Sequence, residues 1–558
     1  MVLAFYVLLL GLLSLAVGTL VARLFFKIVF SIVDSIWIGL GTIASIAGFW
    51  SFFGPLDYYF TVFLVVLSLF SLCRARESLR QVERACKSFW GLHWNYKMGS
   101  SILMVLILAA GSLSGYVLDN DSYYIQTIKW LDTYGLVPGI ANWHLFLGQQ
   151  SGFHVLEAAL NLDFLNAGFN DVGLFMTLVM MLWSVLPANR KESVYQKAFR
   201  NLLVLILPVL LLLGTAPSPD VPVILIHYYV IYKFLFAEEN HKSEHLIVTS
   251  FLVGLACYFK ITSIFLVVFP LLMLLQWKQK SGIGFFKMAC FPFIFAILFL
   301  LKNSMASGYP LFPLTSLSLD VDWLLPLQMA QYYTDATGAQ AYGIAINELR
   351  GLNFWERGLA WIQQSGVEGW LNRGVVLGIL MSGIGLVVRF KNSRIRSVFG
   401  TFLLFATALF YTSPQARFFV PFLFPILLVV LIYSLPFFMK HSARIGRMGI
   451  WGGLLVLLVP GLISGFTDNP RMKEVSRFTV ENIIMPSAQS RFGTAFAKAK
   501  INNINYHDPK SADFFYGTYD IPLPAAQSEY LEYFRNYYNA SPVYRGKSPK
   551  DGFRSMEN

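Results

Sequence analysis

The sequence predicts an α-helical polytopic membrane protein, and two observations support that fold class. Of the 558 residues, 56% are hydrophobic and only 13% are charged, and the mean hydropathy is +0.57. In soluble proteins roughly a quarter of all residues are charged, so the composition excludes an ordinary soluble fold. The second observation is that apolar runs follow one another from the N-terminus to about residue 465. Nothing in the sequence indicates nucleic-acid binding.

The apolar runs predict a bundle of about 13–14 transmembrane helices, because a crossing takes about 20 residues. The first run is not preceded by a basic segment, and Arg23 is its first basic residue. It therefore reads as a membrane helix rather than a cleaved signal peptide. The runs lie near residues 2–22, 29–49, 58–73, 99–117, 171–187, 200–214, 219–236, 246–257, 261–276, 284–301, 372–389, 397–411, 418–437 and 447–465.

The distribution of Lys and Arg predicts how this bundle, residues 1–465, is oriented. One set of alternate loops is rich in basic residues and includes "NRKESVYQK", "RFKNSRIR" and "KHSARIGR". By the positive-inside rule these loops are cytoplasmic. The net charge of +12 then reflects topology and contact with anionic lipid rather than a ligand.

Three long segments fall on the opposite, outer side. They are the loop 118–170, the loop 302–371 and the C-terminal segment 466–558. Ordinary connections are only a few residues long, so these segments are expected to form a small ordered domain outside the membrane. The C-terminal segment is predicted to be extracytoplasmic.

Two aspartates stand where the chain leaves the fourth long run, in "LDNDSYYIQTIKWLDTYG". Asp119, at the end of the apolar run, is suited to act as a general base or to hold a cation, or is simply a boundary residue. Asp121 is placed to cap a following helix. In that helix Tyr124, Ile128 and Leu131 share one face, which predicts an amphipathic helix on the membrane surface.

The same outer loop continues with "GLVPGIANWH", which places Asn142 and His144 in a turn rich in Pro and Gly. We expect these two side chains to contact a polar substrate or to support the loop. A second histidine and a glutamate follow in "HVLEAALN", but their spacing matches no recognised metal-ligand pattern.

Three further charges lie at the outer ends of apolar runs. Asp220, in "TAPSPD", either caps a helix or points into the same layer as Asp119. Lys260, in "YFKITS", is costly in that position unless it snorkels or has a partner such as a lipid phosphate. Arg417, in "SPQARF", either snorkels or contacts phosphate oxygens, where its charge would stabilise a leaving group.

The order of several short motifs resembles a family of bacterial polytopic membrane proteins associated with the GT-C glycosyltransferase fold. The matching pieces run from about residue 118 to the C-terminus: "YYIQTIKW" with "GLVPG", "PSPD", "SGYPLFP", "DVDW", "SPQARF" and a C-terminal "PLP". The sequence departs from the family pattern at Phe146, where a basic residue is expected, and at Gln149 and Gln150, where an aromatic–Asn pair is expected.

This resemblance implies a GT-C-type glycosyltransferase in the bacterial cytoplasmic (inner) membrane, with its active site on the periplasmic or extracellular side. The donor would be a sugar on polyprenyl phosphate or pyrophosphate, and the acceptor a glycan, a lipid or a protein. Asp119 would be catalytic, with Asp121 completing a D-x-D-like pair and Tyr124 binding substrate. If the enzyme uses a divalent metal, Mg²⁺ or Mn²⁺, these two aspartates would hold it.

Two other hypotheses stay open. A flippase, or a polymerase or ligase of lipid-linked envelope polysaccharide, would also need outer-facing cations for lipid phosphates. A non-enzymatic scaffold or receptor is the third hypothesis, and charge pairs sealed between Asp119, Asp220 and the cations would favour it. A transporter is less favoured, because no internal repeat relates the two halves.

Overall fold

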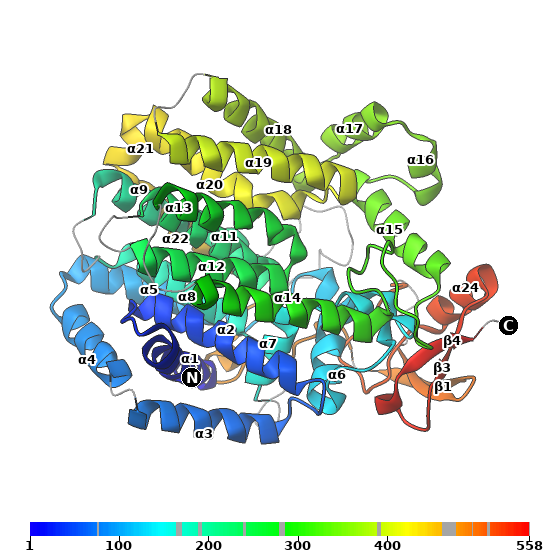
Figure 1. Cartoon of the computed structure of the whole chain (residues 1–558). Helices are drawn as coiled ribbons and strands as arrows, with labels where there is room; N and C mark the ends of the chain where they lie inside the picture. The colour runs from blue at the N-terminus through cyan, green and yellow to red at the C-terminus, as the bar shows by residue number, and fades with distance from the viewer. Residues whose placement is uncertain are drawn as a thin grey trace.

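A computed structural model of the chain shows an almost entirely helical protein (Figure 1). The structure describes residues 1–74, 77–162, 170–187, 192–237, 242–277, 285–387, 392–459, 476–493, 495–509 and 514–556. The bundle helices are α1 (Val2–Val21), α2 (Ile32–Trp50), α3 (Tyr58–Arg74), α4 (Glu77–Trp90), α5 (Trp94–Gly111), α8 (Val172–Val185), α9 (Val194–Leu202), α10 (Leu207–Gly214), α11 (Asp220–Leu235), α12 (Lys242–Phe259), α13 (Val268–Trp277), α14 (Phe285–Ser307), α18 (Gly366–Val387), α19 (Ser393–Thr412), α20 (Ala416–Ser434), α21 (Pro436–Lys440) and α22 (Ser442–Leu458).

The polytopic helical fold class is confirmed, with fewer full-length spans than the apolar runs predicted. Among the described residues, seven helices are long and apolar enough to cross a membrane, or eight if the bent pair at residues 58–90 counts as one span. Other predicted runs form shorter helices: α8 has 14 residues and α11 has 16. At about 1.5 Å per residue, such helices fall short of a hydrocarbon core of roughly 30 Å.

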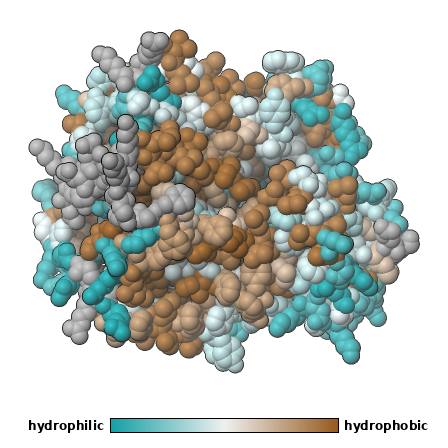
Figure 2. Space-filling model, viewed as in Figure 1, coloured by the Kyte–Doolittle hydropathy of each residue, from teal (hydrophilic) through white to brown (hydrophobic). Residues whose placement is uncertain are grey.

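The helices pack closely where small residues meet. An ideal Cβ atom on Gly18 of α1 would lie 1.8 Å from the carbonyl oxygen of Ser35, and one on Gly39 of α2 would lie 1.8 Å from that of Ser14. Only glycine fits at these two positions, which lets the α1 and α2 backbones touch. Figure 2 shows apolar side chains over the middle of this face of the bundle and hydrophilic ones around its edges, among them the region of α15 (Leu327–Tyr342) and α24 (Ser528–Tyr538).

A buried ion pair that the sequence analysis did not anticipate ties α2 to α11. The Lys233 ammonium lies 2.9 Å from a carboxylate oxygen of Asp34, and the Tyr229 hydroxyl donates to the same carboxylate over 2.9 Å. Both charged side chains are almost completely buried. Lys233 lies in the last turn of α11.

The three long segments outside the apolar runs pack on one another. Trp143 of the first loop stacks on Phe553 of the C-terminal segment, and Phe312 of the second loop contacts the same hydrophobic cluster. The elements here are α6 (Ile125–Tyr134), α7 (Gly152–Leu160), α15, α16 (Ile346–Gly351), α17 (Phe354–Gln363), α24, and two antiparallel strand pairs, β1 (Phe496–Ile501) with β2 (Ile504–Pro509) and β3 (Ser541–Tyr544) with β4 (Phe553–Met556).

The predicted membrane-surface helix exists as α6, but it lies inside the protein. A π-helical turn over Asn120–Tyr124 precedes it, and Ile125, Ile128, Trp130 and Leu131 are all buried. Side chains on several faces of the helix are covered by other segments, so the interpretation of an amphipathic helix lying on lipid is wrong.

Candidate functional site

Asp119 and Arg417 form an ion pair between distant parts of the chain. The Arg417 Nη1 atom donates to the Asp119 carboxylate over 2.7 Å, from the first turn of α20 to the residue just before the π-helical turn. The side chains are 23% and 35% exposed respectively, so solvent and ligands reach both. The Tyr124 hydroxyl donates to the same carboxylate oxygen over 3.3 Å.

A second ion pair, Asp220 with Lys260, lies directly behind the first. The Lys260 ammonium donates to Asp220, whose side chain is only 4% exposed. Asp220 is the first residue of α11, so its carboxylate lies at the N-terminus of that helix as well as in the ion pair. Lys260 also lies 3.7 Å from the centroid of the Phe418 ring, a cation–π contact.

Arg417 connects the two pairs, because its Nε atom lies 3.9 Å from the second carboxylate oxygen of Asp220. We refer to Asp119, Tyr124, Asp220, Lys260 and Arg417 as the paired-charge cluster. Burial lowers the pKa of Lys260, while the Asp220 carboxylate opposes that change. Burial raises the pKa of Tyr124, and the Asp119 charge raises it further, so its hydroxyl stays protonated as a donor.

The sequence analysis missed an aromatic wall beside this cluster. Phe146 stacks on Tyr123 at 5.5 Å and meets the Tyr333 and Tyr516 rings edge-on at 5.3 and 4.8 Å. The Tyr333 hydroxyl donates to Gln149 over 2.5 Å. Tyr123 in turn lies against Tyr124 of the cluster, with ring centroids 4.7 Å apart, which places this wall beside the cluster. Burial raises the pKa of Tyr333, and the Asp119 charge adds to the effect. Two of the family departures, Phe146 and Gln149, therefore meet here.

Three predicted site residues lie away from the paired-charge cluster. The Asn142 side chain binds neighbouring residues of the fold. Its amide donates to the Gly139 and Trp323 carbonyl groups over 3.1 and 2.9 Å and accepts from Ser555 over 2.7 Å. His144 is buried and stacks on Tyr530 at 4.7 Å, and burial lowers its pKa to about 3, so it stays neutral.

Asp121 is the third, and its predicted capping role is wrong. It lies inside the π-helical turn, where its backbone carbonyl accepts from the amides of Thr518 and Tyr519 over 2.9 and 2.8 Å. Its carboxylate is completely buried near Ser490, and burial raises its pKa to about 7. Asp119 and Asp121 face different partners, so they do not form a shared ligand pair.

Metal-binding groups do not gather elsewhere either, within the described part of the chain. No group of three His, Cys, Asp or Glu side chains there could hold an ion. The Glu157 carboxylate instead accepts from the backbone amides of Val172 and Gly173 at the start of α8, each over 3.3 Å.

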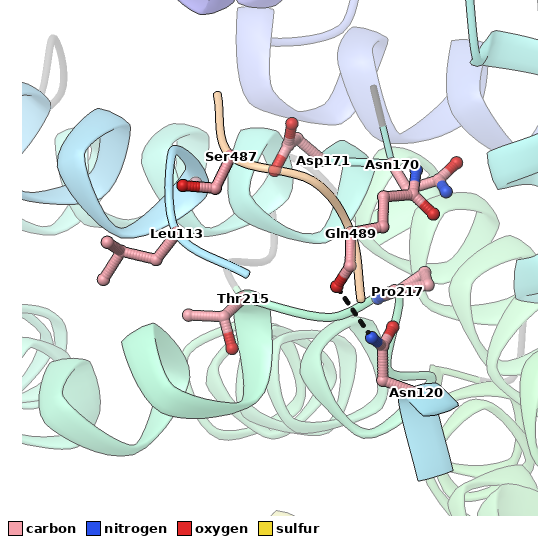
Figure 3. A pocket seen from close by; sticks show the side chains of 9 residues that line it. Leu113, Asn120, Asn170, Asp171, Thr215, Pro217, Ser487 and Gln489 are labelled. Atoms are coloured by element: carbon pink, nitrogen blue, oxygen red, sulfur yellow. Dashed lines mark hydrogen bonds between the residues drawn. The ribbon is translucent and has the colours of Figure 1, made fainter. Parts of the chain in front are cut away.

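A small polar cavity lies beside the π-helical turn (Figure 3). Asn120, Asp171 and Thr215 are among its lining residues, and the Asn120 amide donates to the Gln489 carbonyl over 3.0 Å. Its volume of about 10 Å³ is enough for about one water molecule and too small for a sugar. It is therefore distinct from a substrate site.

With this geometry established, comparison with known proteins adds one result. Residues 1–424 match a family described as a domain of unknown function (DUF8201). The chain belongs to this family. Among curated proteins and among solved structures, none matches the chain.

The family match contains every residue of the paired-charge cluster, from Asp119 to Arg417, whereas β1–β4 and α24 follow it. Chemically, the cluster combines an accessible carboxylate, a guanidinium with a fixed fork of donors, and a second cation behind it. Such a set can accept a proton and hold an anionic oxygen at the same place.

Proposed function

We propose that this multi-pass membrane protein is a GT-C-type glycosyltransferase. It takes a sugar from a polyprenyl phosphate or pyrophosphate donor and transfers it to an acceptor at the outer face of the bacterial cytoplasmic membrane. The observation that carries this proposal is the accessible Asp119 carboxylate, bound to Arg417 at 2.7 Å with Lys260 in the layer behind.

The reaction follows from an exchange of partners at Arg417. An arriving donor phosphate competes with Asp119 for the guanidinium, which binds phosphate and carboxylate oxygens in the same geometry. The released Asp119 carboxylate then takes the proton of the acceptor hydroxyl. The acceptor oxygen attacks the anomeric carbon while the bond from that carbon to the phosphate oxygen breaks, with its electron pair leaving on the phosphate.

Arg417 stabilises the negative charge that develops on the leaving phosphate, and the Tyr124 hydroxyl orients the carboxylate. Attack and departure in one in-line step invert the configuration at the anomeric carbon. The aromatic wall of Phe146, Tyr333 and Tyr516 offers flat apolar faces against which a sugar ring can stack.

The scaffold hypothesis predicted sealed charge pairs, and the two pairs differ in this respect. Asp220 is sealed at 4% exposure, so its pair with Lys260 fits a structural role. The Asp119 and Arg417 side chains keep 23% and 35% of their surface, which supports a pair that opens for a ligand.

Sugar release from a panel of polyprenyl-phosphate-linked donors by the purified protein tests the proposal, with and without Mg²⁺ or Mn²⁺. We expect turnover in the wild type and its loss in Asp119→Asn and in Arg417→Ala. Asp335→Asn is the matched control, because Asp335 of α15 forms a 2.7 Å ion pair with Arg350 of α16 and neither residue belongs to the cluster.

The flippase hypothesis makes the opposite prediction. If no donor is consumed but labelled lipid crosses proteoliposome membranes, that hypothesis replaces ours. Retained turnover in Asp119→Asn would remove the catalytic assignment of this residue.

A further inference from the structure

A second cavity, of about 490 Å³, lies between the C-terminal end of α8 and helices α5, α9 and α22. Its lining combines apolar side chains such as Val204 and Ile450 with the basic residues Lys197, Arg200 and Arg447. We refer to it as the basic cavity. Its volume is within the range of cavities that bind small ligands.

The charges around the basic cavity are unbalanced. Its acid, Glu192, is already occupied: it accepts from Arg200 over 2.8 Å and from the Tyr232 hydroxyl over 3.2 Å. Lys197 and Arg447 are exposed, and neither forms an ion pair with any residue that the structure describes. Two positive charges therefore face the cavity without an opposing carboxylate.

Arg200 adds a buried positive charge to the same wall. It is 4% exposed and donates to the carbonyl groups of Trp183 and Leu186, which close the end of α8. Its Nε atom has no hydrogen-bond partner within the described ranges. This Nε atom is closed to solvent, so Arg200 contributes to the cavity through its positive charge rather than through a free donor.

The three helices that line the cavity each begin in a segment of the basic loop set. Lys197 belongs to "NRKESVYQK" and Arg447 to "KHSARIGR", and α5 follows the loop that ends at His93. The sequence thus predicts that all three ends share the cytoplasmic side, and the structure brings them around one cavity. Basic pockets between membrane helices on that side suit lipid headgroups.

We propose that the basic cavity binds the phosphate headgroup of an anionic membrane lipid. Lys197 and Arg447 neutralise the phosphate, Arg200 adds a third positive charge in the wall, and the apolar lining holds the first part of the hydrocarbon chain. This site does not depend on the proposed transferase activity, because it shares no residue with the paired-charge cluster.

Native mass spectrometry of the full chain in detergent tests this proposal with phosphatidylglycerol, polyprenyl phosphate and phosphatidylcholine as probes. We expect one of the two anionic lipids to bind, and the tighter one identifies the source of the phosphate. In Lys197→Gln/Arg447→Gln the affinity should fall at least about tenfold. The matched control is Arg396→Gln/Arg444→Gln, which removes two exposed basic residues that do not line the cavity.

A cavity-filling variant gives a readout that does not change charge. Gly99 lines the cavity, and a Cβ atom there would meet nothing within 4 Å, so Gly99→Leu fits the fold and occupies the space. It should lower lipid affinity as well. The proposal is overturned if both double variants weaken binding equally, if phosphatidylcholine binds as well as the anionic lipids, or if inorganic phosphate alone displaces the lipid.

Discussion

The two ends of the helical bundle differ in whether their cations have carboxylate partners. In the paired-charge cluster, Arg417 and Lys260 each hold a carboxylate, so an anion enters only by displacing one. In the basic cavity, Lys197 and Arg447 have no carboxylate partner among the described residues, so an anion binds directly. The first arrangement suits a ligand that must be released after reaction, and the second suits a resident lipid.

The largest effect that tests this comparison is a split between turnover and binding in Asp119→Asn. A general base contributes roughly 10²–10⁴-fold to a rate, so turnover should fall by about 10³-fold. Removing the carboxylate also frees Arg417 from its partner, so the affinity for the sugar-free polyprenyl phosphate should hold or rise. Donor turnover and carrier binding are measured on the same preparation.

Equal loss of turnover and of carrier binding in Asp119→Asn would contradict the exchange of partners at Arg417. It would indicate instead that the ion pair only holds the fold. Asp335→Asn should leave both quantities unchanged, because the Arg350–Asp335 pair joins α16 to α15 with its arginine 66% exposed.

The next effect is on stability, and it separates the sealed pair from the accessible pair. Asp220→Asn leaves the Lys260 ammonium, whose side chain is only 19% exposed, without its carboxylate; breaking a fully buried pair costs about 3–5 kcal/mol, which is the upper limit here. We expect a large fall in the thermal unfolding midpoint in detergent, and a small one for Asp335→Asn. Replacing both partners, in Asp220→Leu/Lys260→Met, should recover most of the lost unfolding midpoint. A double variant as unstable as Asp220→Asn would argue against an isolated ion pair.

The sequence located four of these charges by one physical rule: a charge at the end of an apolar run is costly unless it has a partner. That rule found Asp119, Asp220, Lys260 and Arg417. It could not show which acid binds which cation, because pairing depends on how α11 and α20 are rotated and packed. The same limit explains why the Asp34–Lys233 pair was missed.

Local sequence patterns did not predict the roles of residues whose partners are distant in the sequence. Asn142 was expected to contact a substrate or to support the loop, and the sequence could not decide between the two because its partners Trp323 and Ser555 are far away in the sequence. Asp121 was read as a helix cap, a role that requires an α-helix to start there; the π-helical turn removes that start. The polytopic fold itself follows from composition, since hydropathy is a property of each segment alone.

A pH effect of intermediate size should come from Asp121. Burial holds the pKa of Asp121 near 7 in the folded protein, against about 4 in the unfolded chain. The folded state therefore binds the extra proton between pH 4 and 7, so this contribution to stability is present below about pH 4 and is lost as the pH rises to about 7. It amounts to on the order of 4 kcal/mol.

Thermal unfolding of wild type and Asp121→Asn across pH 4–8 measures this contribution. The asparagine variant cannot ionise, so its unfolding midpoint should depend less on pH. From pH 4 to pH 8 it should fall by less than the wild-type midpoint does. Parallel curves for the two proteins would show that another group carries the pH dependence. Asp335→Asn should keep the wild-type slope.

The smallest expected effect is the difference in salt dependence between the two ends. Lys197 and Arg447 are exposed, and salt screens exposed charges over a Debye length of about 10 Å at 0.1 M. Raising NaCl from about 0.05 to 0.5 M should therefore weaken lipid binding at the basic cavity by about threefold. At the paired-charge cluster the same salt weakens the Asp119–Arg417 pair as well as the phosphate contact, so the two changes largely cancel and carrier binding should shift less than about 1.5-fold. Fluorescence titration of labelled lipid and labelled carrier into nanodiscs measures both salt dependences. Lys197→Gln/Arg447→Gln should abolish the salt dependence at the basic cavity alone. Equal salt slopes at both sites would mean that the carrier also meets unpaired cations at the paired-charge cluster, and that Asp119 does not compete with the carrier phosphate.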